Sequence, residues 1–189
     1  MHAPELGSAL LQLARGAIEQ SFGRADTRTA APAHEALARR GATFVTLTQG
    51  GNLRGCIGSL EAYRALRIDV RENAVAAAFR DTRFAPLTRA ELGRVSVEVS
   101  LLTVAQAMVF KSEDDLLEQL RPGIDGVILR HTSHRSTFLP QVWKSFPEPR
   151  EFLAHLKNKA GLPADFWASG ISVSRYEVSK WKETELQQA

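Results

Sequence analysis

The chain has 189 residues, of which 44% are hydrophobic and 24% are charged, and its formal net charge at pH 7 is +3. This length and composition predict one globular domain, with room for a minor lobe, and argue against a disordered or fibrous protein. A three-charge excess over this length is not the clustered positive surface that binds a phosphate backbone, so nucleic acid is not the expected partner.

The single cysteine and the N-terminal segment indicate the compartment. One cysteine cannot form an internal disulfide, hold a cysteine-rich zinc site or ligate an iron–sulfur cluster. Charged residues, among them Glu5, Arg15 and Glu19, interrupt the first twenty residues and break any signal-peptide core. No later run approaches membrane-spanning length. We therefore expect a soluble, unprocessed, cytoplasmic protein without membrane contact and without a cofactor of its own.

The first predicted elements are a helix and a β-hairpin. Apolar residues recur at helical spacing over residues 4–22, and Gly23 ends the pattern. Residues 24–33 are polar, alanine-rich and typical of a linker, and Pro32 is placed to begin a second short helix. Strand-forming residues at 42–48 and 53–57 flank the turn sequence Gln-Gly-Gly-Asn, which predicts the hairpin.

Two elements follow the hairpin. An alanine-rich apolar stripe over residues 66–78 predicts a helix that lies close to a sheet. Residues 94–103 alternate as a strand, with Val95, Val97 and Val99 on one face and Glu98 on the other.

The last third of the chain predicts further short elements. Ser112 is a candidate N-cap for a short helix that ends at Pro122. Strands are expected at 124–130 and 136–139, a helix at 147–159 and a last strand at 171–178 before a charged tail. Because strands and helices do not alternate regularly, the predicted class is α+β, with a mainly antiparallel sheet, flanking helices and a smaller lobe.

The sequence Leu53-Arg54-Gly55-Cys56-Ile57-Gly58 is the main candidate for chemistry. In an extended strand Arg54 and Cys56 point to the same face, and a guanidinium favours the nucleophilic thiolate. The glycines, Gly55 and Gly58, permit a close approach of a ligand to the main chain. The alternative is that Cys56 is a packing residue and that the glycines mark a bulge.

Two further charged positions offer partners for this cysteine. Arg83, in the turn sequence that begins at Asp81, could bind an anionic group, or the two residues could pair with each other. Glu98 could act as a general acid or base if its face is covered, or be an outward residue of the sheet if that face is solvated. His131 and His134 lie in a predicted connection with no nearby carboxylate or second cysteine, so no metal site is predicted.

Several blocks together resemble the AMMECR-type domain family, whose hallmark is the hexapeptide at residues 53–58. The resemblance covers residues 10–178, nearly the whole chain. The other blocks, in chain order, are Phe44-Val45-Thr46-Leu47, Asp81-Thr82-Arg83-Phe84-Ala85-Pro86-Leu87, Val97-Glu98-Val99-Ser100-Leu101-Leu102, Gly126-Val127-Ile128, Leu139-Pro140-Gln141-Val142 and Lys159-Ala160-Gly161-Leu162.

The resemblance implies an α+β domain with the hexapeptide beside a cleft. Prokaryotic members are named AmmeMemoRadiSam system protein A, after an association with a Memo-like protein and a radical SAM protein. Both are partners that the resemblance implies, and an iron–sulfur cluster would belong to the radical SAM protein. The segment His131–Arg135 departs from the family pattern, because it is longer and more basic than the short glycine-containing turn expected there.

Three hypotheses follow for function. The first is an enzyme, or a component of one, that acts on a small anionic substrate. In it Cys56 and Glu98 are catalytic, and the substrate is bound by Arg54, Gly55, Gly58, Arg83 and Gln141. The second is a non-catalytic adaptor that presents the hexapeptide hairpin to another protein. The third is nucleic-acid binding through Arg39, Arg40, Arg54, Arg64 and Arg67.

Overall fold

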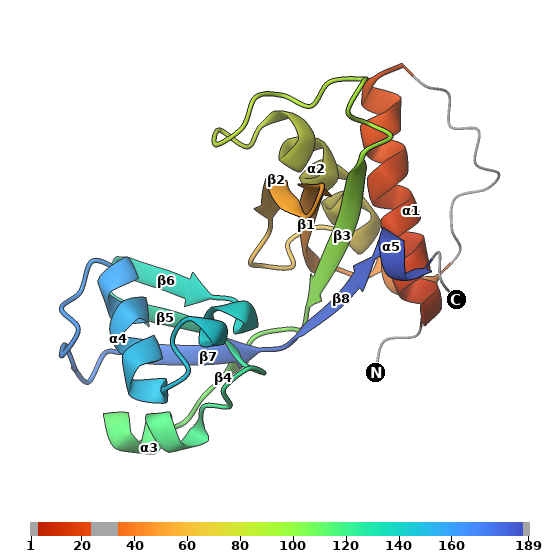
Figure 1. The fold of residues 1–189 in the computed structure, drawn as a ribbon. Helices are drawn as coiled ribbons and strands as arrows, with labels where there is room; N and C mark the ends of the chain where they lie inside the picture. Colours follow the sequence, from red (N-terminus) through yellow and green to blue (C-terminus); the bar gives the residue numbers. More distant parts are fainter. Residues whose placement is uncertain (1–3, 24–33, 187–189) are drawn as a thin grey trace. The chain divides into compact units, whose positions relative to one another are not determined.

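A computed structural model describes residues 4–23 and 34–186, so the linker expected at residues 24–33 lies outside the described residues. The chain forms two compact units: unit 1 comprises Met1–Leu102 and Ser179–Ala189, and unit 2 comprises Thr103–Val178. Each unit has its own hydrophobic core and one four-stranded sheet (Figure 1). The predicted α+β class is therefore confirmed.

Within the described residues, unit 1 contains three α-helices, one 3₁₀ helix and a sheet with the strand order β2-β1-β3-β8. The β-hairpin β1–β2 and the pairing of β1 with β3 are antiparallel. Its elements are α1 (Pro4–Ser21), the 3₁₀ helix η1 (Glu35–Ala38), β1 (Ala42–Gln49), β2 (Asn52–Gly58), α2 (Leu66–Phe79), β3 (Val95–Leu102), β8 (Val178–Lys182) and α5 (Glu183–Leu186).

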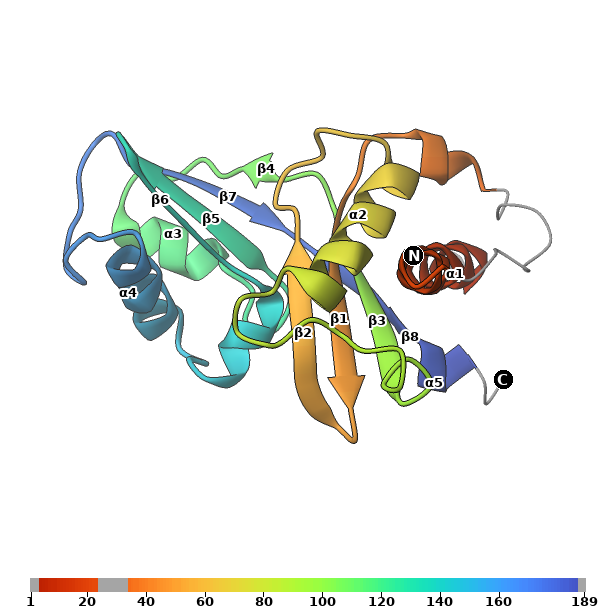
Figure 2. The same cartoon turned by 90° about the horizontal axis from the view of Figure 1, so that it is seen from above.

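Helices α1 and α2 pack on the same face of this sheet (Figure 2). Alternation along β1 and β3 turns Val45, Leu47, Val97 and Val99 toward the helices, and all four are fully buried. The intervening residues of both strands lie on the opposite face. Helices α1 and α2 therefore do not cover these intervening residues.

Unit 2 contains a second sheet with the order β4-β7-β5-β6, in which neighbouring strands are antiparallel. In its core, Trp143 stacks on Phe152 with ring centroids 3.7 Å apart and donates its indole N–H to the Asp125 carbonyl at 2.7 Å. Its elements are β4 (Gln106–Ala107), α3 (Glu113–Gln119), β5 (Gly126–His131), β6 (His134–Phe138), the 3₁₀ helix η2 (Pro140–Lys144), α4 (Pro149–Lys159) and β7 (Ser172–Tyr176).

Two sequence expectations are wrong. The charged tail after residue 178 forms strand β8, in which Trp181 packs against the core of unit 1, followed by α5. The connection expected at residues 131–135 is a two-residue turn, because His131 and His134 are themselves paired in register. Thr132, in this turn, has a φ of 50°, in the left-handed region that glycine more often occupies.

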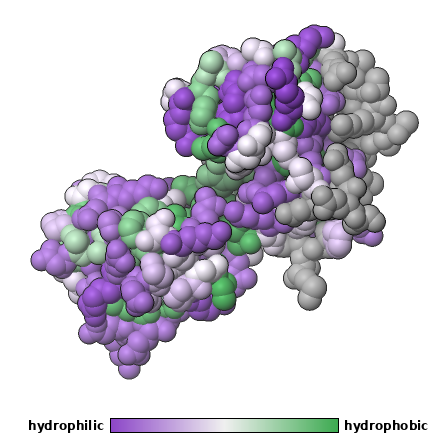
Figure 3. All heavy atoms as spheres, viewed as in Figure 1, coloured by the Kyte–Doolittle hydropathy of each residue, from purple (hydrophilic) through white to green (hydrophobic). Residues whose placement is uncertain are grey.

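On the face drawn in Figure 3, hydrophilic residues dominate and hydrophobic residues form small separate areas. Within residues 4–23 and 34–186, no helix combines the length and the apolar character needed to span a bilayer.

Candidate functional site

Strand β2 carries the hexapeptide at the edge of the unit 1 sheet. Cys56 lies directly opposite Thr46 of β1, and Thr46 lies opposite Glu98 of β3. Gly55 is opposite the buried Leu47 and therefore faces the helices. We call the sheet surface that carries Thr46, Cys56 and Glu98 the thiol face; it is the face that α1 and α2 do not cover.

Both glycines of the hexapeptide have neighbours that exclude a side chain. A Cβ atom at Gly55 would overlap the main-chain carbonyl of Ala77, because α2 crosses β2 at this point. A Cβ atom at Gly58 would overlap the ring of Phe44, its partner on β1. The space that the sequence assigned to a ligand beside Gly55 and Gly58 is thus filled by the protein itself.

The Cys56 main chain is held from outside the sheet. Its N–H donates to Asp81 Oδ2 at 2.8 Å, and its carbonyl accepts from Arg83 Nη2 at 3.2 Å. Asp81 and Arg83 also form a two-pronged ion pair, with Nη2–Oδ2 at 2.6 Å and Nε–Oδ1 at 2.9 Å. The two side chains therefore satisfy the groups of an edge strand that a further strand would otherwise pair with.

The Cys56 thiol is half-buried and has a polar neighbour. Its sulfur accepts a hydrogen bond from Thr46 Oγ1 at 3.3 Å across the hairpin. This contact favours one orientation of the sulfur on the thiol face. The combination of a held main chain and a directed side chain gives this cysteine a fixed position.

The Asp81–Arg83 ion pair is buried at one end and solvated at the other. The Asp81 side chain is 5% exposed and that of Arg83 is 56% exposed. Hydrogen bonds from Arg83, and then from the Cys56 N–H, hold the pKa of Asp81 far below its ordinary value. The hydrogen bond to Asp81 raises the pKa of Arg83, and the nearby Cys56 sulfur adds to this effect. A permanent positive charge therefore lies near the thiol.

Arg54 pairs with Glu91, whereas the sequence suggested that it faces Cys56. A register shift in the hairpin makes Arg54 the extra residue between the pairs Leu53–Thr48 and Gly55–Leu47, so strict alternation with Cys56 is broken. Its guanidinium binds Glu91 at 2.9 Å and the Ala85 carbonyl at 2.9 Å. Hydrogen bonds from Arg54, and then from the Thr88 N–H, lower the pKa of Glu91 to about 2.

Glu98 lies on the thiol face but at a distance from the sulfur. Its side chain is 18% exposed, and its oxygens are 3.6 Å from Lys180 Nζ and 3.5 Å from Lys182 Nζ, both on β8. Two strand spacings separate Glu98 from Cys56, about 10 Å. Direct proton transfer between the two is therefore excluded, although a small molecule could span them.

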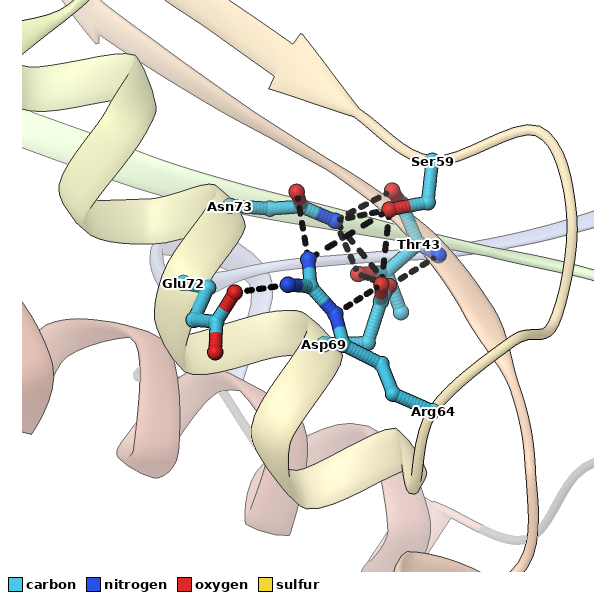
Figure 4. Close-up of polar contacts among 6 residues, drawn as sticks. All are labelled: Thr43, Ser59, Arg64, Asp69, Glu72 and Asn73. Atoms are coloured by element: carbon cyan, nitrogen blue, oxygen red, sulfur yellow. Dashed lines mark hydrogen bonds and ion pairs between the residues drawn. The ribbon is translucent and has the colours of Figure 1, made fainter.

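A second polar cluster joins the start of α2 to the segment after the hexapeptide (Figure 4). Asp69 Oδ2 accepts from the Thr43 N–H and hydroxyl, both at 2.7 Å, and from Asn73 Nδ2 at 3.0 Å. Asp69 Oδ1 accepts from Ser59 Oγ at 2.7 Å and Arg64 Nε at 2.9 Å. Asp69 is fully buried. We call Thr43, Ser59, Arg64, Asp69, Glu72 and Asn73 the Asp69 network; it holds the chain where it leaves β2.

The remaining sequence candidates belong to unit 2. Gln141 lies in η2 of unit 2, whereas the thiol face belongs to unit 1. His134 Nδ1 is 2.8 Å from the Ala160 carbonyl, and His131 packs against Phe166. Among residues 4–23 and 34–186, no three histidine, cysteine, aspartate or glutamate side chains are grouped as metal ligands.

Three of the five arginines named for nucleic-acid binding are engaged within the protein. Arg39 pairs with Glu35, and Arg54 pairs with Glu91. Arg64 pairs with Asp69 and Glu72. These ion pairs remove much of the free positive charge that a phosphate backbone would need.

Comparisons with known proteins find matches that cover most of this chain. The AMMECR1 family model matches residues 11–181. A protein of Methanothermobacter thermautotrophicus is 36% identical over 180 residues, which is 94% of each chain. Protein MJ0810 of Methanocaldococcus jannaschii is 39% identical over 135 residues, 70% of this chain and 67% of that protein.

A solved structure has the same fold. The crystal structure of the uncharacterised protein PH0010 from Pyrococcus horikoshii matches with a TM-score of 0.80 and 31% sequence identity, covering 95% of this chain and 92% of that one. The match extends over both units, and the family model spans most of the chain. This chain belongs to the AMMECR1 family.

Proposed function

We propose that this protein is an enzyme, or a component of one, in which the Cys56 thiol reacts with a small anionic substrate that Arg83 binds. One observation carries the proposal: the Asp81–Arg83 pair holds both main-chain groups of Cys56 and leaves the guanidinium half exposed near the sulfur. A positioned nucleophile beside a fixed positive charge is an arrangement that accelerates attack on an anionic electrophile.

The other residues of the thiol face have supporting roles in this proposal. Thr46 orients the sulfur through its hydroxyl. Glu98 handles a proton at the far end of a substrate that spans the two strand spacings. Arg54, engaged by Glu91, holds the loop at residues 85–91 and does not bind the substrate.

Two alkylating reagents of different charge test whether Arg83 attracts an anion to Cys56. Alkylation of Cys56, followed by intact mass, is compared for iodoacetate and iodoacetamide, which differ in charge. The rate constant for iodoacetate divided by that for iodoacetamide should be about threefold higher in the folded protein than in a free cysteine peptide, because Arg83 attracts the carboxylate of iodoacetate. Arg83→Gln should return the ratio to the peptide value, whereas Arg67→Gln, an exposed position on α2, should not. A ratio that Arg83→Gln leaves unchanged would reject the proposed role.

The family resemblance supports two partners and a compartment. We propose that the protein works with a Memo-like protein and a radical SAM protein in the cytoplasm. The lone cysteine agrees with a reducing compartment and leaves any cluster to the partner. Tagged protein should retain both partners from a native lysate at low salt, and retention of neither would count against this arrangement.

An adaptor role is the second candidate, supported by exposed apolar residues around β2. Leu53, the first residue of the hexapeptide, is 44% exposed, and Tyr63, which follows the hexapeptide in sequence, is 59% exposed. Since Asp81 and Arg83 occupy the strand edge at Cys56, a partner would contact side chains there and would not add a strand. Partner retention lost in Leu53→Ser and Tyr63→Ser, but kept in Cys56→Ser, would favour this role over catalysis.

A further inference from the structure

A hollow lies between helices α1 and α2, on the side of the unit 1 sheet opposite the thiol face. Its volume is about 560 Å³, within the range of about 300–1,000 Å³ typical of small-molecule sites. It shares no lining residue with the thiol face. The residues that line it are Ala17, Gln20, Ser21, Arg71, Glu72, Val75 and Arg80.

The lining has an apolar part and a polar, charged part. Ala17 is buried and Val75 is half-buried, whereas Arg71 and Arg80 are exposed. Residues 17, 20 and 21 share one face of α1 because they are three or four positions apart. Gln20 Oε1 accepts a hydrogen bond from Arg71 Nη2 at 2.8 Å, which restrains this guanidinium against α1.

The charge of the hollow favours an anion. The one carboxylate in the lining, Glu72, is paired with Arg64 of the Asp69 network. Neither Arg71 nor Arg80 forms a salt bridge within residues 4–23 and 34–186, whereas Arg54 and Arg83 each hold a carboxylate.

Carbonyl groups at the end of α1 are already occupied. The Glu19 carbonyl accepts from the Phe22 N–H at 3.1 Å, and the Gln20 carbonyl accepts from the Gly23 N–H at 2.9 Å. These contacts offset part of the negative end of the helix dipole, which would otherwise oppose an anion here. The two guanidiniums are then the dominant charges of the hollow.

We propose that this hollow binds a small organic dianion, whose acidic groups pair with Arg71 and Arg80 and whose apolar middle lies against Ala17 and Val75. Arg71 lies in α2 and Arg80 is the C-cap residue of this helix, nine positions later. Nine positions along a helix correspond to about 13 Å, and the two arginine side chains are long enough to close part of that distance. The ligand is therefore elongated, with its acidic groups separated by a short hydrocarbon body.

Suberate, a linear eight-carbon dicarboxylate, is a suitable probe. Titration of the ¹⁵N-labelled full chain at constant ionic strength should give saturable shifts of the amide signals of Gln20, Ser21 and Val75, with a Kd of about 1 mM. Octanoate, which has the same length and one carboxylate, should bind about fivefold more weakly.

Two variants and a control identify the charges responsible. Arg71→Gln and Arg80→Gln should each weaken suberate binding about fivefold, because each removes one charge-assisted contact. Arg67→Gln also removes a positive charge from α2 but lies outside the lining, and it should leave the affinity within a factor of two, roughly. No saturable shift at these signals, equal affinity for octanoate, or an equal effect of all three variants would each overturn the proposal.

Discussion

Two carboxylates at opposite ends of helix α2 hold the hexapeptide strand in place, and they do so in different ways. Asp69, in the first turn, is fully buried and accepts hydrogen bonds from five donor atoms within the Asp69 network. Asp81, just after the helix, binds the Cys56 N–H and a guanidinium that is 56% exposed.

This difference distinguishes a carboxylate that only stabilises the fold from a carboxylate that lies at the candidate reactive site. The polar groups around Asp69 satisfy one another, and its buried carboxylate is closed to a ligand. The Asp81 pair satisfies the Cys56 main chain and still presents a positive charge to solvent near a thiol. The first centre is closed within the fold, and the second leaves an exposed guanidinium beside the Cys56 main chain, which is the feature that the proposed function uses.

The largest expected effect is at Asp69. Asp69→Asn should lower the free energy of unfolding by about 3–5 kcal/mol, because it leaves the buried Arg64 contact without its charge and mismatches several donors. Urea unfolding followed by circular dichroism measures this loss. Glu72→Gln, on the exposed side of the same network, should cost under about 1 kcal/mol. Equal effects of the two substitutions would show that burial does not distinguish them.

Helix α2 packs closely on β2 at Gly55, and a substitution at this position tests that contact. Gly55→Ala should destabilise the protein by about 2–3 kcal/mol, because the new methyl group would meet the Ala77 carbonyl and force the helix outward. Gly16→Ala is the matched control, since nothing lies within contact distance of its Cβ and α1 should gain about 0.5–1 kcal/mol. A neutral Gly55→Ala would contradict the close packing of α2.

A smaller effect, dependent on pH, is expected at Asp81. Its pKa is lowered in the folded protein, so its contribution is fully present above the ordinary value of 3.8 and is lost as the pH falls below it. Asp81→Asn should cost about 1–2 kcal/mol at pH 7. It should also flatten the fall in the urea midpoint between about pH 5 and pH 2.5. An unchanged slope would show that this ion pair does not contribute to acid unfolding.

The smallest change in stability is expected at the thiol itself. Cys56→Ser should alter the free energy of unfolding by less than about 1 kcal/mol, because the side chain is half-buried and its polar neighbour Thr46 can bond a hydroxyl equally well. Thermal and urea unfolding measure this difference. A loss of several kcal/mol would identify Cys56 as a packing residue, as the alternative sequence interpretation held.

Much of the fold follows from local sequence patterns. The expectations for α1, the hairpin, α2, β3 and α4 are close to the observed bounds, since periodicity and turn residues act over a few positions. Strand β8 was missed because its lysines resemble a solvated tail. Its assignment depends on Trp181 reaching the core of unit 1 and on pairing with β3, a contact far away in sequence.

The candidate site was predictable only in part. Cys56, Arg83 and Glu98 were identified from residue type and alternation, and the pairing of Asp81 with Arg83 was one of two alternatives. The bond from the Cys56 N–H to Asp81 joins residues 25 positions apart, so no local pattern indicates it. The Asp69 network had a local signal, since Asp69 and Asn73 lie beside the apolar stripe of α2.

The proposed function requires that folding fixes the Cys56 sulfur where a small anion can reach it. The most direct measurement is the rate constant for alkylation of Cys56 by iodoacetate at one pH, in the native protein and in the chain unfolded by urea. We expect the native sulfur to react at least as fast as the unfolded one. Native protection by a factor of about 100 or more would contradict it, because the sulfur would then react only after unfolding.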